Sequence, residues 1–300
     1  MPDDLSEILE SLQPELLDGA QDRTEGPLWH PDGYLTFVDI QRHHLLRWDP
    51  SARTTSVIRE DTGEGNGCTL DRQGNLLMCQ GGDHRCVTRM DAAGNVTTIA
   101  DRWQGKRFHK PNDVICRSDG SIYFTDPSLR IAPELRELDF AGVYRIDPQG
   151  QLHLATDQCV YPNGLALSPD ESILYVAISR AAEADFEREA KGEFCPNRRL
   201  LAFDVAPDGT LSDHRVFIDM SSAEGGVPDG MKVDTKGRIF ATGSGGVWVI
   251  SPEGEKLGVI RVPEVLRNVA FGGPDFRTLF ITAGASLYSL RVKEPGIGAF

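Results

Sequence analysis

The stretch NGLALSPDESILYVA, residues 163–177, is one of six copies of a pattern that decides the fold. Each copy begins with an oxygen-bearing polar residue, continues through apolar residues, turns on a segment with Gly or Asp, and enters a second apolar run. The other copies are EGPLWHPDGYLTFVD from Glu25, NGCTLDRQGNLLMCQ from Asn66, NDVICRSDGSIYFTD from Asn112, DGMKVDTKGRIFATG from Asp229 and NVAFGGPDFRTLFIT from Asn268. Two extended runs joined by such a turn predict a β-hairpin.

The spacing of the copies predicts the architecture. Successive copies begin 39 to 66 residues apart. A repeat of roughly 40 to 50 residues with several strands in each unit is typical of a β-propeller blade. The sequence therefore predicts an all-β six-bladed β-propeller in which residues 1–300 form a single domain. Residues 1–20 carry no copy of the pattern and are expected to be a lead-in, part of which could complete the last blade.

Composition excludes several function classes. The formal net charge is −14 and the isoelectric point is about 4.9, so we expect no binding to nucleic acid or to an anionic membrane. The acidic, interrupted first residues do not read as a signal peptide, and no run approaches the roughly 18 apolar residues of a membrane helix. A cytoplasmic protein is expected, with its six scattered cysteines reduced and structural.

The first residues of the six copies suggest a metal site. The innermost strand of each blade lines the central channel, so equivalent positions form a ring at one mouth. This ring would hold Glu25, Asn66, Asn112, Asn163, Asp229 and Asn268. Ca²⁺ prefers such carboxylate and amide oxygens, whereas zinc normally recruits His or Cys. The structural alternative is that Asn and Asp favour tight turns, and we expect that role for Asn66 and Asn268.

Five of these motifs together resemble a known family. TEGPLWHPDG, GKRFHKPNDVICRSDGSIYFTDPS, YPNGLALSPDESILYVA, GVPDGMKVDTKGRIFATG and NVAFGGPDFRTLFITA are similar to motifs of the SMP-30/gluconolactonase/LRE-like family of six-bladed propeller lactonases. The resemblance implies metal-dependent hydrolysis of a sugar lactone to the aldonic acid. It also implies one divalent cation in the channel, with Ca²⁺ expected first and Zn²⁺, Mn²⁺ or Fe²⁺ left open.

The resemblance also assigns roles to individual residues. Glu25, Asn163 and Asp229 match the metal ligands, Asn112 matches an asparagine that completes the site or touches the sugar, and Asp229 matches the proposed general base. The chain departs from the family in two places. It has Phe-His-Lys-Pro before Asn112, which puts His109 and Lys110 at substrate-facing positions, and Ile-Ser-Arg after the fourth copy. Asp126 could bind a substrate hydroxyl or serve only the turn before Pro127.

Two other functions stay open. A propeller with a channel cation could hydrolyse organophosphates, as phosphotriesterases do, or could bind calcium without catalysis, because a fold does not determine a function. The two carboxylates of the ring argue against the second possibility. We expect a small-molecule sugar lactone as the partner, and a monomer or small homo-oligomer.

Overall fold

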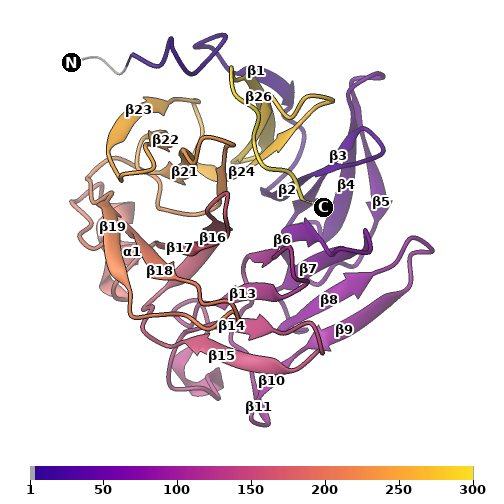
Figure 1. Cartoon of the computed structure of the whole chain (residues 1–300), viewed down its shortest axis with the longest axis vertical. Coiled ribbons are helices and arrows are strands. Elements are labelled where there is room, and N and C mark those ends of the chain that lie inside the picture. Colours follow the sequence, from indigo (N-terminus) through magenta and orange to yellow (C-terminus); the bar gives the residue numbers. More distant parts are fainter. Residues whose placement is uncertain (1–3, 300) are drawn as a thin grey trace.

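The computed structural model describes residues 4–299. In this part of the chain six four-stranded antiparallel sheets are arranged as blades around an axis (Figure 1), so the predicted six-bladed propeller is confirmed. Blade 1 contains β2 (Thr24–His30), β3 (Tyr34–Asp39), β4 (His44–Asp49) and β5 (Thr54–Arg59). Blade 2 contains β6 (Gly65–Leu70), β7 (Leu76–Gln80), β8 (Cys86–Met90) and β9 (Val96–Ala100). Blade 3 contains β12 (Val114–Cys116), β13 (Ile122–Asp126), β14 (Gly142–Ile146) and β15 (Leu152–Thr156).

The second half of the ring repeats this arrangement. Blade 4 contains β16 (Pro162–Leu167), β17 (Ile173–Ile178), β18 (Arg199–Asp204) and β19 (Arg215–Asp219). Blade 5 contains β20 (Met231–Val233), β21 (Ile239–Gly243), β22 (Gly246–Ile250) and β23 (Lys256–Ile260). Blade 6 contains β24 (Leu266–Gly272), β25 (Thr278–Ala283), β26 (Ser286–Arg291) and β1 (Glu15–Asp18). Outside the blades lie the β10–β11 hairpin (Arg102–Trp103 and Lys106–Arg107), a 3₁₀ turn (Pro133–Leu135) and helix α1 (Ala184–Ala190).

Blade 6 joins the two ends of the chain. Strand β1 pairs antiparallel with β26, with Glu15 opposite Ser289. Before this strand, Leu5, Ile8 and Leu9 are buried in the apolar cluster between blades 5 and 6. The residues before the first copy therefore close the ring through both hydrogen bonds and apolar contacts.

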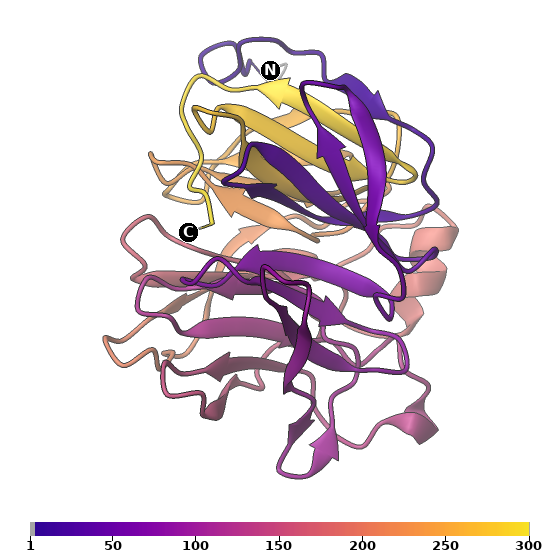
Figure 2. The ribbon, with the colours of Figure 1, turned by 90° about the vertical axis from the view of Figure 1, so that its right-hand side faces the viewer.

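Apolar side chains hold the blades together. Most of the buried apolar side chains of the described residues fall into six clusters, and each cluster takes strand residues from two neighbouring blades. The two ends of the channel differ, because α1 lies on one face of the propeller and the C-terminal tail on the other (Figure 2). All six cysteines are free thiols, and no helix among residues 4–299 is long and apolar enough to span a membrane.

The turn inside each copy has one repeated geometry. Eight residues after the first residue of each copy, the backbone adopts a positive φ between 54° and 93°. Four of these six positions are Gly, which tolerates this conformation without strain, and the others are Glu171 and Phe276. The turns recognised in the sequence are therefore real hairpin turns in all six blades.

A β-bulge recurs where each inner strand reaches the mouth of the channel. In blade 4, Asn163 and Gly164 both lie opposite Ala177, between the pairs Pro162–Ile178 and Leu165–Val176. An extra residue of this kind bends the strand and changes the direction of its side chains. Similar register shifts occur in β2, β6 and β24.

The bulge corrects the alignment of the sixth copy. In blade 3 the hydroxyl of Thr125 accepts from the backbone N–H of Asp113, and in blade 6 the hydroxyl of Thr282 accepts from that of Asn268. Asn268 therefore occupies the second position of the bulge, equivalent to Asp113, and Arg267 occupies the first. The hairpin turn alone gave an alignment that was wrong by one residue, because the bulge moves by one position relative to the turn in this blade.

Candidate active site

Asn163 presents an unpaired amide oxygen at the channel mouth. Its Nδ2 donates to Ser179 Oγ at 2.8 Å, and Ser179 in turn donates to the carbonyl of Pro228, the residue before Asp229. This bond directs the other end of the amide away from Ser179, and Oδ1 is buried without a hydrogen-bond partner in the described structure. A buried acceptor with no partner is costly unless a ligand satisfies it.

Two buried carboxylates accompany that oxygen. Glu25 is 3% exposed and Asp229 is 7% exposed. Burial raises the pKa of both groups, and the charge of Glu25 raises the pKa of Asp229 further. The Arg267 guanidinium opposes these increases. Two like charges held together out of water form an unfavourable arrangement, which a cation between them would relieve.

The side chains at this mouth fit a hard divalent cation. Glu25, Asn163 and Asp229 supply carboxylate and amide oxygens, the ligands preferred by Ca²⁺ and similar ions. Among residues 4–299 no three His, Cys, Asp or Glu side chains form a metal-binding group, so a metal here would need the Asn amide as well. The unpaired Asn163 Oδ1 meets this requirement.

The remaining asparagines of the ring divide into two kinds. Asn66 and Asn112 are half-buried, and Asn66 Oδ1 has no hydrogen-bond partner in the described structure. Asn268 is buried, donates from Nδ2 to Glu25 Oε2 at 3.1 Å and accepts from the Val269 N–H at 2.9 Å. Asn268 therefore fixes Glu25, and its own amide oxygen is occupied by the backbone.

The loop before Asn112 differs from the expected arrangement. His109 and Asp126 are both fully buried. The His109 ring donates from Nε2 to the Leu138 carbonyl at 3.0 Å, and the Asp126 carboxylate accepts the backbone N–H groups of His109 and Lys110. Neither side chain is placed to meet a substrate, so both expectations of substrate contact are corrected here. Their role is to fix the loop.

Unlike His109, Lys110 is only partly buried and reaches open space. Its ammonium lies 2.5 Å from Glu64 Oε2, and both side chains are partly exposed. The pair lines a groove of about 780 Å³ that also contains Ile131. Substrate contact by Lys110 therefore stays a prediction, and such contact would have to compete with Glu64.

The sequence did not identify three groups at the site. Asp113 is 2% exposed, with Oδ2 unpaired, and its pKa is raised by burial. Its signal was the Asp that follows Asn112 where four other copies have Gly. Arg267 was hidden by the shifted bulge. Ser179 lies in the Ile-Ser-Arg departure, which could have indicated a changed partner for Asn163.

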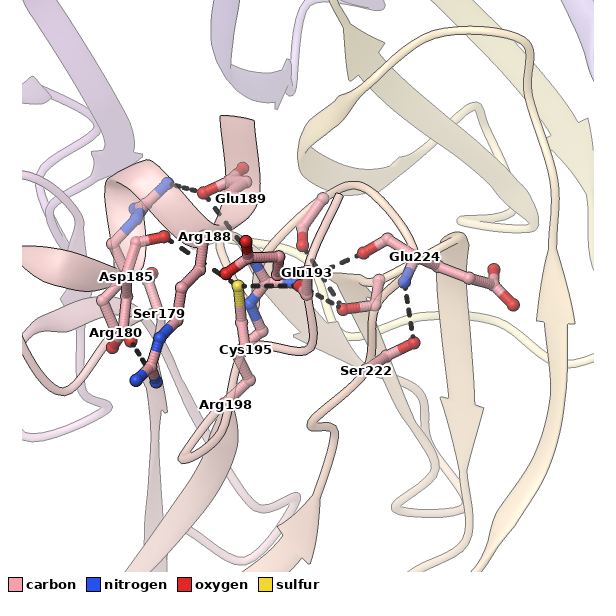
Figure 3. A network of polar contacts seen from close by, with 12 residues as sticks. Ser179, Arg180, Asp185, Arg188, Glu189, Glu193, Cys195, Arg198, Ser222 and Glu224 are labelled. Atoms are coloured by element: carbon pink, nitrogen blue, oxygen red, sulfur yellow. Dashed lines mark hydrogen bonds and ion pairs between the residues drawn. The ribbon is translucent and has the colours of Figure 1, made fainter. Parts of the chain in front are cut away.

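Helix α1 and the loop after it are tied to the ring beside Ser179. Figure 3 shows the polar network of this segment, in which Glu189 of α1 forms ion pairs with Arg180 and Arg198. Arg198 is 1% exposed and donates to Ser244 Oγ of blade 5 at 3.0 Å. The long segment between β17 and β18, which contains α1, is therefore anchored by buried arginines beside the candidate site.

Fold and site together define a six-bladed β-propeller with carboxylate and amide side chains gathered at one channel mouth. Residues 23–285 match the family described as SMP-30/gluconolactonase/LRE-like region, and the chain belongs to this family. The resemblance noted from the sequence motifs is thereby confirmed.

Relatives with names and structures are similar along most of their length. A gluconolactonase of Zymomonas mobilis is 31% identical, with 91% of this chain and 79% of the relative covered. Pentonolactonase XacC of Haloferax volcanii is 32% identical, with 86% of this chain and 80% of the relative covered. The structure of a gluconolactonase from Xanthomonas campestris superposes with a TM-score of 0.83 at 34% identity, covering 97% of this chain and 93% of that one.

Proposed function

We propose that this protein hydrolyses a sugar lactone to the corresponding aldonic acid with the help of a divalent cation at the channel mouth. The proposal is supported by the burial of two carboxylates, Glu25 and Asp229, and by the unpaired, buried oxygen of Asn163 at the start of another inner strand. The gluconolactonase and pentonolactonase relatives support a lactone as the substrate. Oxygen ligands favour Ca²⁺, while Zn²⁺, Mn²⁺ and Fe²⁺ remain to be compared.

Each residue at the channel mouth would have its own role in the reaction. Glu25, Asn163 and Asp229 would hold the cation. When bound, it would supply a positive charge that polarises the lactone carbonyl and makes a water more acidic. Asp229 would accept a proton from the attacking water or orient that water. Asn112, half-buried at the same mouth, would hold a sugar hydroxyl through its amide or complete the cation site.

The overall reaction balances without any other reagent. The water oxygen forms a bond to the carbonyl carbon, and the bond from that carbon to the ring oxygen breaks. The ring oxygen ends as a hydroxyl, and the new carboxylic acid releases a proton near neutral pH. Proton release therefore reports the reaction directly.

Metal depletion tests the proposal. Protein treated with a chelator should lose hydrolysis of glucono-, galactono- and xylono-lactone, and Ca²⁺ or another of the four cations should restore it. A phosphotriester assayed in parallel separates the organophosphate alternative. Turnover of the phosphotriester alone would replace the proposal with that alternative, and cation binding without any turnover would indicate a calcium-binding propeller.

A further inference from the structure

A groove of about 780 Å³ lies beside the candidate site. It is lined by the β3–β4, β7–β8 and β13–β14 loops and by the connections from β5 to β6 and from β9 to β12. Neighbouring strands within each blade are antiparallel, so all of these segments lie on the face where the inner strands begin. Helix α1, in the equivalent loop of blade 4, marks this face in Figure 2.

The groove adjoins the ring of first residues. Glu64 and Lys110 line it, and each lies two positions before a ring residue, Asn66 or Asn112. Two residues of chain span at most about 7 Å. The stem of Lys110 crosses Gly81, where a Cβ would lie 2.7 Å from its Cε, and its ammonium reaches Glu64. A ligand at the channel mouth can therefore extend into the groove across this ion pair.

Hydrogen bonds hold the walls of the groove in place. Arg85 is 8% exposed, and its Nε donates to the carbonyls of Phe108 and His109 at 2.6 and 2.9 Å. The other end of its guanidinium donates to the Leu135 carbonyl at 3.4 Å. One side chain thus joins blade 2 to both loops of the opposite wall. A site built in advance in this way loses little freedom when a ligand binds.

The charges that line the groove balance. Three of the side chains are basic and three are acidic, namely Arg85, Arg107 and Lys110 against Asp61, Glu64 and Asp83. An extra charge on the ligand would leave one of these groups uncompensated. The groove therefore fits a neutral group that can bond to both kinds of side chain.

The two histidines of the groove have opposite hydrogen-bonding roles. The Glu64 N–H donates to His43 Nδ1 at 3.1 Å, so in the neutral ring the proton is on Nε2, which is a donor. His84 Nδ1 donates to Gln80 Oε1 at 3.1 Å, so its Nε2 is an acceptor. Hydroxyl groups both donate and accept, so a polyhydroxy ligand can use both rings.

The size and the composition of the groove point to a sugar ring. Pockets for ligands of moderate size have volumes of about 300–1,000 Å³, so the groove has room for a second ring beside the lactone. Only Ile131 and Leu135 contribute apolar side chains, and Leu135 is 60% exposed. They offer a small apolar strip for the C–H groups of a sugar, whereas an alkyl chain would meet mostly glycine, histidine and charged residues.

We propose that the groove is a second sugar subsite and that the protein prefers lactones that carry a neutral glycosyl group outside the lactone ring. The inference rests on the proposed lactone hydrolysis and specifies its substrate class. The lactone ring lies at the channel mouth, the second sugar lies in the groove, and the glycosidic bond between them stays intact during hydrolysis.

Lactones that share one ring test the proposal. Glucono-lactone is compared with cellobiono- and maltobiono-lactone, which carry a glucosyl group on O4, and with gentiobiono-lactone, which carries it on O6. With the metal-loaded enzyme, kcat/KM for at least one of these should exceed that for glucono-lactone by about tenfold or more. Equal or lower values for all three would overturn the proposal. So would a decano-lactone with an alkyl tail that proves the best substrate.

Variants connect the preference to the groove. Asp83→Trp places a bulky ring at an exposed position of the groove, and His84→Ala removes an acceptor. Each should lower the ratio of kcat/KM for the glycosylated lactone to that for glucono-lactone by about tenfold, mainly through KM of the glycosylated lactone. His214→Ala, at an exposed position outside the groove, should leave the ratio unchanged. A thermal melt confirms folding. If folded Asp83→Trp and His84→Ala keep the wild-type ratio, the groove is not the subsite.

A binding measurement separates this inference from the proposed function. Cellobiitol, maltitol and sorbitol, which contain no lactone, are titrated calorimetrically into metal-loaded protein. Absence of all lactone hydrolysis would reject the proposed function, while tighter binding of a disaccharide alditol that is lost in Asp83→Trp would still support the subsite. Equal binding of the three alditols would reject the subsite even in an active lactonase.

Discussion

The side-chain amide of Asn163 donates to Ser179 Oγ at 2.8 Å and thereby fixes which end of that amide faces the channel. Ser179 is fully buried and donates its own proton to the Pro228 carbonyl, so its position is determined from both sides. Asn and Ser thus form a unit that joins blade 4 to the strand entry of blade 5. The orientation of a candidate metal ligand depends on a residue that does not itself belong to the ring.

Ser179→Ala should weaken cation binding without unfolding the protein. Loss of a residue that orients a metal ligand typically reduces metal affinity about 10- to 100-fold. Stability should fall by about 1 kcal/mol, the usual net value of one hydrogen bond. Calcium titration calorimetry measures the first effect and a thermal melt the second. Ser172→Ala, at an exposed position, is the control. Unchanged calcium affinity in Ser179→Ala would show that cation binding does not depend on the orientation of Asn163.

Asp229→Asn should have opposite effects on activity and on the stability of the metal-free protein. Removing this charge relieves its repulsion with Glu25, so the chelator-treated variant should melt at a higher temperature than wild type. Lactone hydrolysis and the increase in Tm on adding Ca²⁺ should both be lost. Asp208→Asn, on an exposed turn, controls for surface charge. A variant that still hydrolyses lactone would remove Asp229 from the catalytic role.

The sequence predicted the fold because its signals were local and repeated six times. Hairpin turns and alternating strands depend on neighbouring residues, and each was present in every copy. The same signals placed Glu25, Asn163 and Asp229 at equivalent ends of their strands.

What the sequence could not show depends on contacts between distant residues. The shift that put Arg267 in place of Asn268 is a bulge, which the turn spacing does not report. The burial of His109 results from Leu138 and Asp126 closing over it, and these contacts exist only in the folded chain.

Gly164→Ala should disturb the position of Asp229. A Cβ atom at residue 164 would lie 2.1 Å from the backbone oxygen of Asp229, and the backbone of a neighbouring blade cannot yield cheaply. Overpacking of this kind typically costs about 1–3 kcal/mol. Gly225→Ala is the matched control, since a Cβ there meets nothing within 4 Å. The free energy of unfolding, measured by chemical denaturation, and lactone turnover should both fall in Gly164→Ala but not in Gly225→Ala. Equal stability of the two variants would show that the two blades can separate locally.

Leu9→Ala should show how strongly the N-terminal segment holds blade 6. Leu9 is 3% exposed in the cluster between blades 5 and 6, and truncating a buried Leu costs about 2–5 kcal/mol. Leu12, three residues later, is 61% exposed, so Leu12→Ala should change stability by less than about 0.5 kcal/mol. Urea denaturation of the two variants compares them directly. Similar midpoints would mean that the segment before β1 contributes little to closure.

The ion pair between Asp275 and Arg291 should make blade 6 sensitive to acid. Two side-chain bonds of 2.8 and 2.9 Å from Arg291 hold the pKa of Asp275 well below its ordinary value, which is about 3.9 in an unfolded chain. A carboxyl whose pKa is lowered by folding contributes stability above its unfolded pKa and loses this contribution as the pH falls through the folded value. Both side chains are nearly half exposed, so the contribution should be at most about 1 kcal/mol.

Asp275→Asn isolates this contribution. Wild type should be more stable than the variant at pH 7, and the difference should shrink as the pH is lowered below about 4 and disappear once Asp275 is protonated in the folded state as well. Denaturation at several pH values and constant salt measures the difference. Asp275 also accepts a hydrogen bond from the Arg277 N–H at 3.1 Å, within the turn. A stability difference that stays constant with pH would mean that Asp275 acts through this turn and that its ion pair with Arg291 does not stabilise blade 6.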